Sequence, residues 1–338
     1  MRKSVRLAVA ACAGLVALAV AGPAWAVYKP ALVVVAQNPA PAKKTAVLVG
    51  VAQTPADDPT LKIQVYAPLG YLANLTQPVG ATIGDVSGDV ILRDLGGAVA
   101  PIEGKVKVDN PQAHLTDPCA PGLHQAIWSL NVTIAGSPLT VYLYVDTITS
   151  GPEAAFASAK IQLCLAGPIG TPGGAQLLDA FFDINGVFTN PSTSGYRVWR
   201  STFTPYIPGT PNPNPAGTVE AQAFVPSAVA LKLKVVSGKR GRITISGRLL
   251  VQGSPFAGAD VDLYIGNKKV GRTLHTNRSG RFTTRRRIKR KTAFRALATF
   301  VGDRPGGCVA PAIAPAGCVN ATIAFIAVSN RASGRFRR

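Results

Sequence analysis

Apolar and polar residues alternate with a period of two along most of the chain, which is the pattern of strands with one buried face. In the stretch 128–134, Trp128, Leu130 and Val132 alternate with polar residues, so Trp128 is expected to point into a core. Runs of this kind recur between Gly, Pro and Asn, and a helical period is not sustained anywhere. Within residues 43–225 the pattern predicts strands near 45–53, 61–67, 86–92, 104–108, 125–134, 139–145, 158–165, 177–188, 196–203 and 218–225.

The segments between these runs predict how they are connected. Asp57-Asp58-Pro59-Thr60 is typical of a turn and predicts a hairpin that joins 45–53 to 61–67. Residues 205–217 are rich in proline, but the stretch behind them still alternates like a strand, so we expect a long hairpin loop there. We therefore predict one large β-sandwich domain over residues 43–225, preceded by a loosely held arm at 27–42.

A second block of alternation fills residues 228–330. Its connections carry turn residues, such as Gly266-Asn267 and Asn277-Arg278-Ser279-Gly280. The fold class predicted for the chain is all-β, with two β-sandwiches in series and a basic tail at 331–338. The second block has about seven expected strands: 229–236, 242–251, 259–265, 269–275, 280–288, 293–301 and 319–328.

Three segments of this block carry a likeness to a known family: ISGRL at 245–249, PFAGADVDLY at 255–264 and TNRSGRF at 276–282. They resemble the bacterial Ig-like and carboxypeptidase-regulatory-like domains, which are small prealbumin-type sandwiches appended to exported proteins. The block departs from that pattern in the basic Arg278, in the arginine-rich strand that follows and in an added cysteine-containing loop. The resemblance implies a spacer or adhesion module without catalytic residues.

The larger domain loosely resembles uncharacterised exported proteins of high-GC Gram-positive bacteria, and no site can be carried over from them.

Residues 1–26 have the pattern of a secretory signal peptide. Three basic residues precede an apolar stretch at 7–22, and Ala24-Trp25-Ala26 supplies a small-x-small cleavage pattern. The apolar stretch is shorter than the ~20 residues that span a hydrocarbon core. We expect cleavage near Ala26, removal of Cys12 with the signal peptide, and a mature protein that is extracellular or on the cell surface.

The net charge of +20 is concentrated at one end of the chain. Residues 27–227 hold 10 basic and 13 acidic side chains, whereas residues 228–338 hold 23 basic and three acidic ones. The basicity therefore belongs to the predicted Ig-like domain.

Four cysteines remain after the signal peptide, an even number that suits disulfides in an exported chain. We expect one bridge in each domain, Cys119 with Cys164 and Cys308 with Cys318. In the chain-entropy model the bridges stabilise by about 4 and about 3 kcal/mol. The first bridge is expected to staple the large domain, and the second to pin only a surface loop.

Enzyme motifs are absent from the sequence, and no cofactor is expected. His114, Cys119 and His124 do not have the spacing of a zinc site, so a disulfide explains Cys119 better than a metal. The acidic pairs Asp57-Asp58 and Asp85 with Asp89 suit hydrolase or calcium chemistry, but we expect both in Gly/Pro-punctuated turns, where acidic residues are common.

Period-two alternation predicts a basic face on the Ig-like domain. If its first, second and fifth strands share a sheet, aliphatic and aromatic side chains such as Leu231, Ile245 and Phe282 face the core, and Arg286 also falls on the inward side. Such a face suits an anionic polymer of the envelope or an acidic polysaccharide, and the alternative is charge that only keeps the domain soluble. The outer side is expected to carry Lys232, Lys234, Arg248, Arg285, Arg287 and Lys289.

Tyr142 and Tyr144 alternate with Val141, Leu143 and Val145 in the large domain. If the aliphatic side is core, the two tyrosines lie on the opposite face, where they can stack on sugar rings or pack under a loop.

These patterns together predict a secreted or cell-surface protein that is structural and binding rather than catalytic, and that attaches through its basic domain to an anionic polymer. Aromatic residues do not interleave the basic ones, so a nucleic-acid partner is not expected. The alternative is a secreted enzyme that acts on glycans through an unrecognised carboxylate pair in the large domain.

Overall fold

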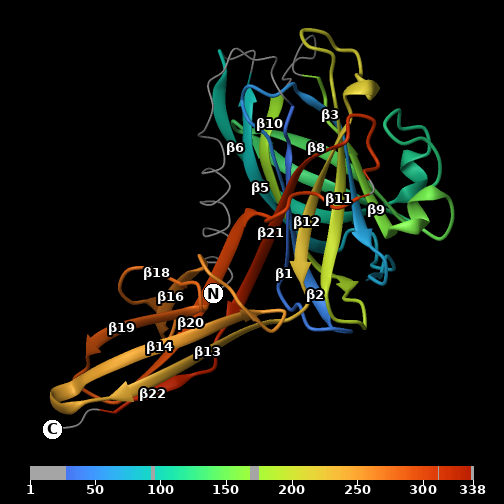
Figure 1. Cartoon of the computed structure of the whole chain (residues 1–338). Coiled ribbons are helices and arrows are strands. Elements are labelled where there is room, and N and C mark those ends of the chain that lie inside the picture. The colour runs from blue at the N-terminus through green and yellow to red at the C-terminus, as the bar shows by residue number, and fades with distance from the viewer. Residues whose placement is uncertain (1–27, 93–95, 168–174, 311, 336–338) are drawn as a thin grey trace.

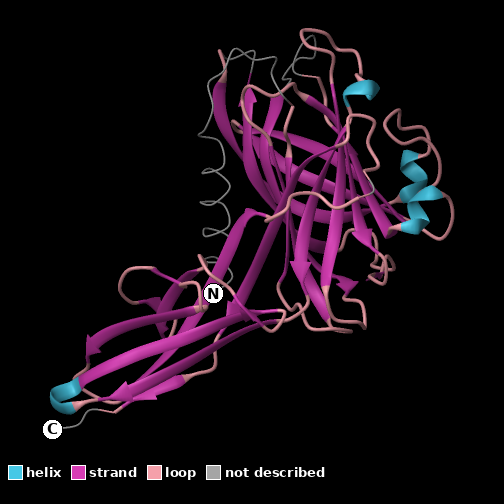
Figure 2. Cartoon of the chain, in the orientation of Figure 1, coloured by secondary structure: helices cyan, strands magenta, loops and turns pink. Residues whose placement is uncertain are grey.

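A computed structural model describes residues 28–92, 96–167, 175–310 and 312–335. The predicted signal peptide, Cys12 and the expected cleavage site lie outside the described residues. The described chain consists of strands with a few single 3-10 turns, arranged as a large unit and a smaller carboxy-terminal unit (Figures 1 and 2). The prediction of an all-β fold is confirmed. No helix among the described residues is long and apolar enough to cross a membrane.

The large unit is one continuous antiparallel sheet that curls on itself. Its strands follow the order β1-β2-β10-β5-β6-β7-β8-β9-β3-β11-β12, and β4 adds a short pairing to β10. The bounds are β1 (Ala31–Ala36), β2 (Lys44–Ala52), β3 (Thr60–Pro68), β4 (Leu72–Ala73), β5 (Thr82–Leu92), β6 (Ala98–Asp109), β7 (Ala126–Ile134), β8 (Ser137–Thr147), β9 (Ala157–Cys164), β10 (Ala175–Thr189), β11 (Tyr196–Pro205) and β12 (Val219–Pro226).

The inner face of this curled sheet carries the main core. Alternate residues of every long strand point inward, among them Trp128, Phe188 and Trp199, which are all but fully buried. Each such side chain stabilises the fold by roughly 1.5–3 kcal/mol relative to an exposed one. Trp128 points inward as its alternation predicts, and the proline-rich segment is a hairpin loop between the paired strands β11 and β12.

The prediction of a loosely held arm at 27–42 is wrong, because Ala31–Ala36 form strand β1. Leu32 and Val34 are buried in the main core, while Val33 and Val35 pack on the other side against Leu48, Phe181 and Ala324. The sequence of a strand that is buried on both faces is a continuous apolar run, and Ala31–Ala36 is such a run.

The predicted hairpin between 45–53 and 61–67 is also wrong. β2 pairs with β1 and β10, whereas β3 pairs with β9 and β11, so seven strand-to-strand steps of the sheet separate them. The turn itself is present, and Asp57 holds it by accepting hydrogen bonds from the backbone N–H groups of Lys29 and Thr54, at 3.0 and 2.6 Å.

The carboxy-terminal unit is a two-sheet sandwich, in agreement with the predicted Ig-like arrangement. One sheet holds β13 (Val229–Ser237), β14 (Arg242–Val251), β15 (Ser254–Pro255) and β19 (Arg281–Arg287). The facing strands are β16 (Asp260–Ile265), β17 (Lys268–Lys269), β18 (Leu274–His275), β20 (Thr292–Asp303), β21 (Cys318–Val328) and β22 (Ala332–Gly334). A separate core lies between the sheets. The expected strand at 269–275 is reduced to β17 and β18.

The two units share hydrogen-bonded structure. The chain leaves the large unit after β12, and β21 later returns to pair in parallel with β12 while it pairs with β20 on its other side (Figure 1). Thr322 on β21 also donates to the backbone oxygen of Leu32 on β1 at 2.5 Å. β21 therefore lies against both ends of the curled sheet. Within the expected tail at 331–338, residues 332–334 form β22 against β20.

Candidate functional site

The outer surface of the sheet formed by β13, β14 and β19 is strongly basic. The register places Lys232 opposite Arg248 and Arg248 opposite Arg281, and it places Arg242 opposite Arg287. Strand alternation turns all of these outward, while Leu231, Ile245 and Phe282 fill the core as expected. The basic face therefore consists of exposed residues at alternate positions of three adjacent strands: Lys232, Lys234, Arg242, Arg248, Arg281, Arg285 and Arg287.

The structure brings together five of the six residues predicted for this face. The sixth, Lys289, is exposed just beyond the end of β19. Arg242 and Arg281 were missed, although both fall on the outward side of strands that were predicted. Counting the alternation through to the first residue of each strand would have found them.

Acidic side chains do not neutralise this face within the described residues. Two of the three acids beyond residue 228 lie on the facing sheet, where Asp260 pairs with His275 at 2.8 Å and Asp262 with Lys269 at 2.7 Å. The third, Asp303, ends β20. Like charges on adjacent strands repel each other, so the basic face is an arrangement that a bound polyanion would stabilise.

Small hydroxyl side chains occupy the centre of the basic face. Ser246 and Thr283 lie directly opposite each other on β14 and β19. They help to line a shallow, open depression of about 950 Å³. Lys232, Lys234, Arg248 and Arg281 also line it. The hydroxyl groups can donate hydrogen bonds and the cations supply charge, which together suit phosphate or carboxylate oxygens.

Arg286 points inward, as the alternation predicts, but its side chain lies at the edge of the sandwich and not within the core. Its guanidinium donates to the backbone oxygen of Val270 at 3.1 Å. Gly271 makes room for it, because a Cβ atom there would lie 1.4 Å from the guanidinium nitrogen. The positive φ of Gly271, +78°, also favours glycine.

Of the two alternatives for Tyr142 and Tyr144, the structure shows packing under a loop. Tyr144 is buried beneath the segment after β6, and its hydroxyl donates to Asp117 at 2.6 Å. Tyr142 is half-buried and packs against His114, with ring centroids 4.1 Å apart. The loop therefore covers Tyr144 and packs against Tyr142.

The histidines near these tyrosines hold that loop in place. Asp117 also bonds His114 at 2.8 Å, and the hydrogen bond from Tyr144 is the main cause that lowers the pKa of Asp117. His124 bonds Asp146 at 2.7 Å. Among the described residues no group of three or more His, Cys, Asp or Glu side chains is arranged to hold a metal ion.

Asp85 and Asp89 lie within strand β5, so their expected placement in turns is wrong. The register puts Asp179 opposite Asp89 and Asp183 opposite Asp85 on β10, which forms a row of carboxylates on one side of the sheet. Burial, and then the charge of Asp89, raise the pKa of Asp179 to about 6. Asp85 forms an ion pair with Lys105, and Gln37 donates to Asp183 at 3.1 Å.

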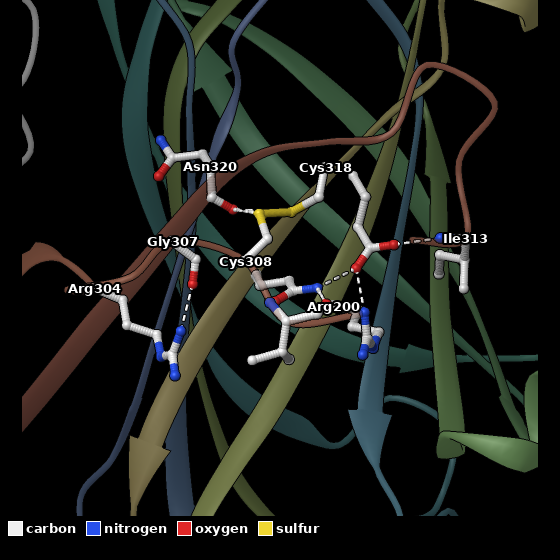
Figure 3. Close-up of a disulfide and its surroundings, with 10 residues drawn as sticks. Arg200, Arg304, Gly307, Cys308, Ile313, Cys318 and Asn320 are labelled. Carbon is white, nitrogen blue, oxygen red and sulfur yellow. Dashed lines mark hydrogen bonds and ion pairs between the residues drawn. A yellow bond between two sulfur atoms is a disulfide. The ribbon is translucent and has the colours of Figure 1, made fainter. Parts of the chain in front are cut away.

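Both predicted disulfides are present, Cys119–Cys164 and Cys308–Cys318, with Cα atoms 5.8 and 6.3 Å apart. The second does more than pin a surface loop, so that expectation is wrong. The loop that it closes lies over β12 of the large unit (Figure 3). There Glu220, which is fully buried, accepts a hydrogen bond from the backbone N–H of Ile313 at 2.5 Å.

A small polar network completes this contact. Glu220 pairs with the buried Arg200 of β11, and Gln222 donates to Glu220 at 2.7 Å. Gln222 also exchanges two hydrogen bonds with the backbone of Val309, at 2.8 and 2.9 Å. We call Arg200, Glu220, Gln222 and the 308–318 loop the interunit clasp. It satisfies buried polar groups that would otherwise destabilise the junction.

Comparisons with known proteins do not identify the chain. No protein-family model and no curated protein matches it. Among solved structures it is similar to the T6 backbone pilin of serotype M6 Streptococcus pyogenes, which is described as a modular three-domain structure decorated with variable loops and extensions. The sequence identity is 9%, the match covers 80% of this chain and 48% of the pilin chain, and the TM-score is 0.27. The chain thus spans about half of the pilin's length, and a likeness at this level does not bear on function.

Proposed function

We propose that the protein is exported and acts at the cell exterior as a non-catalytic structural and binding protein that attaches through its basic face to an anionic polymer of the envelope. The observation that carries this proposal is the basic face itself: seven exposed cations on three adjacent strands, with no acidic neighbour on that surface among the described residues. Two disulfides support an oxidising location, which agrees with the expected signal peptide.

The elongated arrangement of the two units suits attachment at one end. The carboxy-terminal unit projects from the large unit, and β20 and β21 connect the two as long paired strands (Figure 1). The clasp and β21 hold the junction, so a polymer bound at the basic face would position the large unit away from it. A rigid connection between an anchoring unit and a displayed unit is useful in a surface protein.

Co-sedimentation with purified cell walls tests the proposal. We expect the full mature chain to sediment with walls at low salt and to be released as ionic strength rises, since exposed charges are screened over about 8 Å at 0.15 M. Walls from which phosphate-containing and acidic polymers have been extracted should no longer retain it. Retention that is indifferent both to salt and to this extraction would contradict the proposal.

A second candidate function is a glycan hydrolase that uses Asp179 and Asp89. The observation that favours it is the raised pKa of Asp179 beside a second carboxylate, since such a pair can divide acid and base roles. None of the described cavities includes either residue, so this candidate ranks second. Release of reducing sugars from wall polysaccharide, abolished in Asp179→Asn and retained in Asp58→Asn, would establish it in place of the first.

A further inference from the structure

The wall of the large unit has an opening between β8 and the end of β9. The two strands pair only from Leu143 opposite Leu163 to Thr147 opposite Ala159. The earlier part of β8, from Ser137 to Tyr142, pairs with β7 on one side and has no strand partner on the other among the described residues. The chain after Cys164 instead follows β3, where the Leu165 N–H donates to the Leu61 oxygen at 2.7 Å.

A cavity of about 390 Å³ lies behind this opening and extends into the interior of the curled sheet. Its volume falls within the range of small-molecule sites, about 300–1,000 Å³. Strands β5, β6, β7, β9 and β10 supply its inner lining, which is aliphatic and aromatic: Val86, Ile102, Leu130, Leu163, Leu177 and Phe182. Thr140, Tyr142 and the Cys119–Cys164 disulfide lie toward its outer side.

The inner part of the cavity offers water few hydrogen-bonding partners, because its lining side chains are aliphatic and aromatic and the edge of β8 without a strand partner lies only at the opening. Tyr144 gives its hydroxyl to Asp117, and Thr140 donates to Asn131 at 3.3 Å. A space with an apolar lining either stays dry or takes an apolar ligand, because a buried water needs two to four polar partners. Each methylene that enters contributes about 0.8 kcal/mol of transfer free energy.

A cationic group lies on the outer surface close to the opening. Lys62 of β3 is directly opposite Cys164 of β9, and Cys164 lines the cavity. Lys62 is half-buried and forms no ion pair with a carboxylate of the described residues, and Glu153, whose charge acts on Lys62, is bonded to Lys160 at 2.9 Å. Burial, and then the charge of Lys160, lower the pKa of Lys62. An anionic partner would stabilise the charged form of Lys62, which burial and Lys160 disfavour.

We propose that the large unit binds a long-chain carboxylic acid, whose aliphatic chain enters the cavity through the opening beside β8 and whose carboxylate pairs with Lys62. This site lies in the large unit and is separate from the basic face, so it adds a second ligand class to the proposed attachment function. The aliphatic lining recognises the chain, and the unpaired ammonium distinguishes an acid from a neutral lipid.

Titration of the full mature chain with palmitic acid and with hexadecanol, followed by calorimetry, tests the proposal. We expect one palmitate per chain. Lys62→Met should weaken palmitate about tenfold or more and leave hexadecanol unchanged. The matched control, Lys43→Met, removes an exposed lysine elsewhere and should change neither. Ala175→Phe, which fills the rim of the cavity, should abolish binding of both ligands.

A second measurement uses no substitution in the cavity lining, so its result does not depend on whether Ala175→Phe folds. In a Trp199→Phe background, Trp128 of β7 reports on the interior, and a brominated fatty acid should quench its fluorescence. Absence of both palmitate binding and quenching would overturn the site. Equal palmitate affinity in Lys62→Met would overturn the role of the carboxylate, and binding that survives Ala175→Phe would place the ligand elsewhere.

Discussion

Replacing Glu220 with glutamine would remove one buried charge from the interunit clasp with little change in volume. Glu220 is fully buried and Arg200 is 7% exposed, so the guanidinium would lose its ion pair with Glu220 in a place that is almost closed to water. The new amide group would also present N–H donors where the Ile313 N–H and the Gln222 amide now donate. Breaking a buried ion pair from one side typically costs about 3–5 kcal/mol, and we expect a loss in this range.

Urea unfolding followed by tryptophan fluorescence measures this loss. Trp128 and Trp199 are both fully buried in the large unit, and Trp199 is next to Arg200 in β11. With a slope of about 3 kcal/mol per molar urea, the midpoint should fall by about 1 M or more. Glu103→Gln, an exposed substitution of the same chemistry, should leave the midpoint unchanged.

A double variant separates the ion pair from the rest of the clasp. Arg200→Met with Glu220→Gln removes both charges, so no buried charge is left uncompensated, and it should lose less than the sum of the single variants. If Glu220→Gln lies within about 0.5 kcal/mol of the wild type, as substitutions on exposed surfaces usually do, the clasp does not hold the junction.

Three further substitutions test other parts of the structure. The pKa of Asp179 is raised to about 6 in the folded state, so its contribution to stability falls as pH rises from about 4 through 6. Asp179→Asn should therefore stabilise the fold by on the order of 1–2 kcal/mol at pH 7, a value that allows for solvent screening. Below pH 4 it should not change the stability, and urea titrations at pH 7 and below pH 4 measure both effects. Gly271→Ala should lower the thermal midpoint, at a cost of about 1–3 kcal/mol, because it strains a positive φ and displaces Arg286. Cys308→Ser should leave one free thiol by reagent titration and lose up to about 3 kcal/mol, since the bridge closes a 10-residue separation over the clasp; unchanged stability would contradict the clasp.

The alternation of the carboxy-terminal unit made it predictable from the sequence. Strands β13, β14 and β19 each have one buried and one more exposed face, so the alternation shows which way side chains such as Leu233 and Lys234 point. The same reasoning placed Arg286 on the inward side. The basic face followed once three strands were assigned to one sheet, and the register of β13, β14 and β19 agrees with that assignment.

The errors arose where distant parts of the chain cover a surface. β1 has no alternation because β21 covers one face and the core the other. Glu220 alternates like a surface residue, and only the returning 308–318 loop buries it. Tyr144 is covered in the same way by the segment that holds Asp117. These contacts join residues far apart in sequence, and local periodicity contains no information about them.

Binding of two charge-matched triple variants to cell walls tests the central claim most directly. Arg242→Ser, Arg285→Ser and Arg287→Ser remove three cations from the basic face, whereas Lys268→Ser, Arg272→Ser and Arg295→Ser remove three exposed cations from other parts of the same unit. At about 0.15 M salt, the first variant should lose most of its retention and show a weaker dependence on salt, and the second should sediment like the wild type. Equal loss in both variants would mean that only net charge matters, and equal retention in both would mean that attachment does not use the basic face.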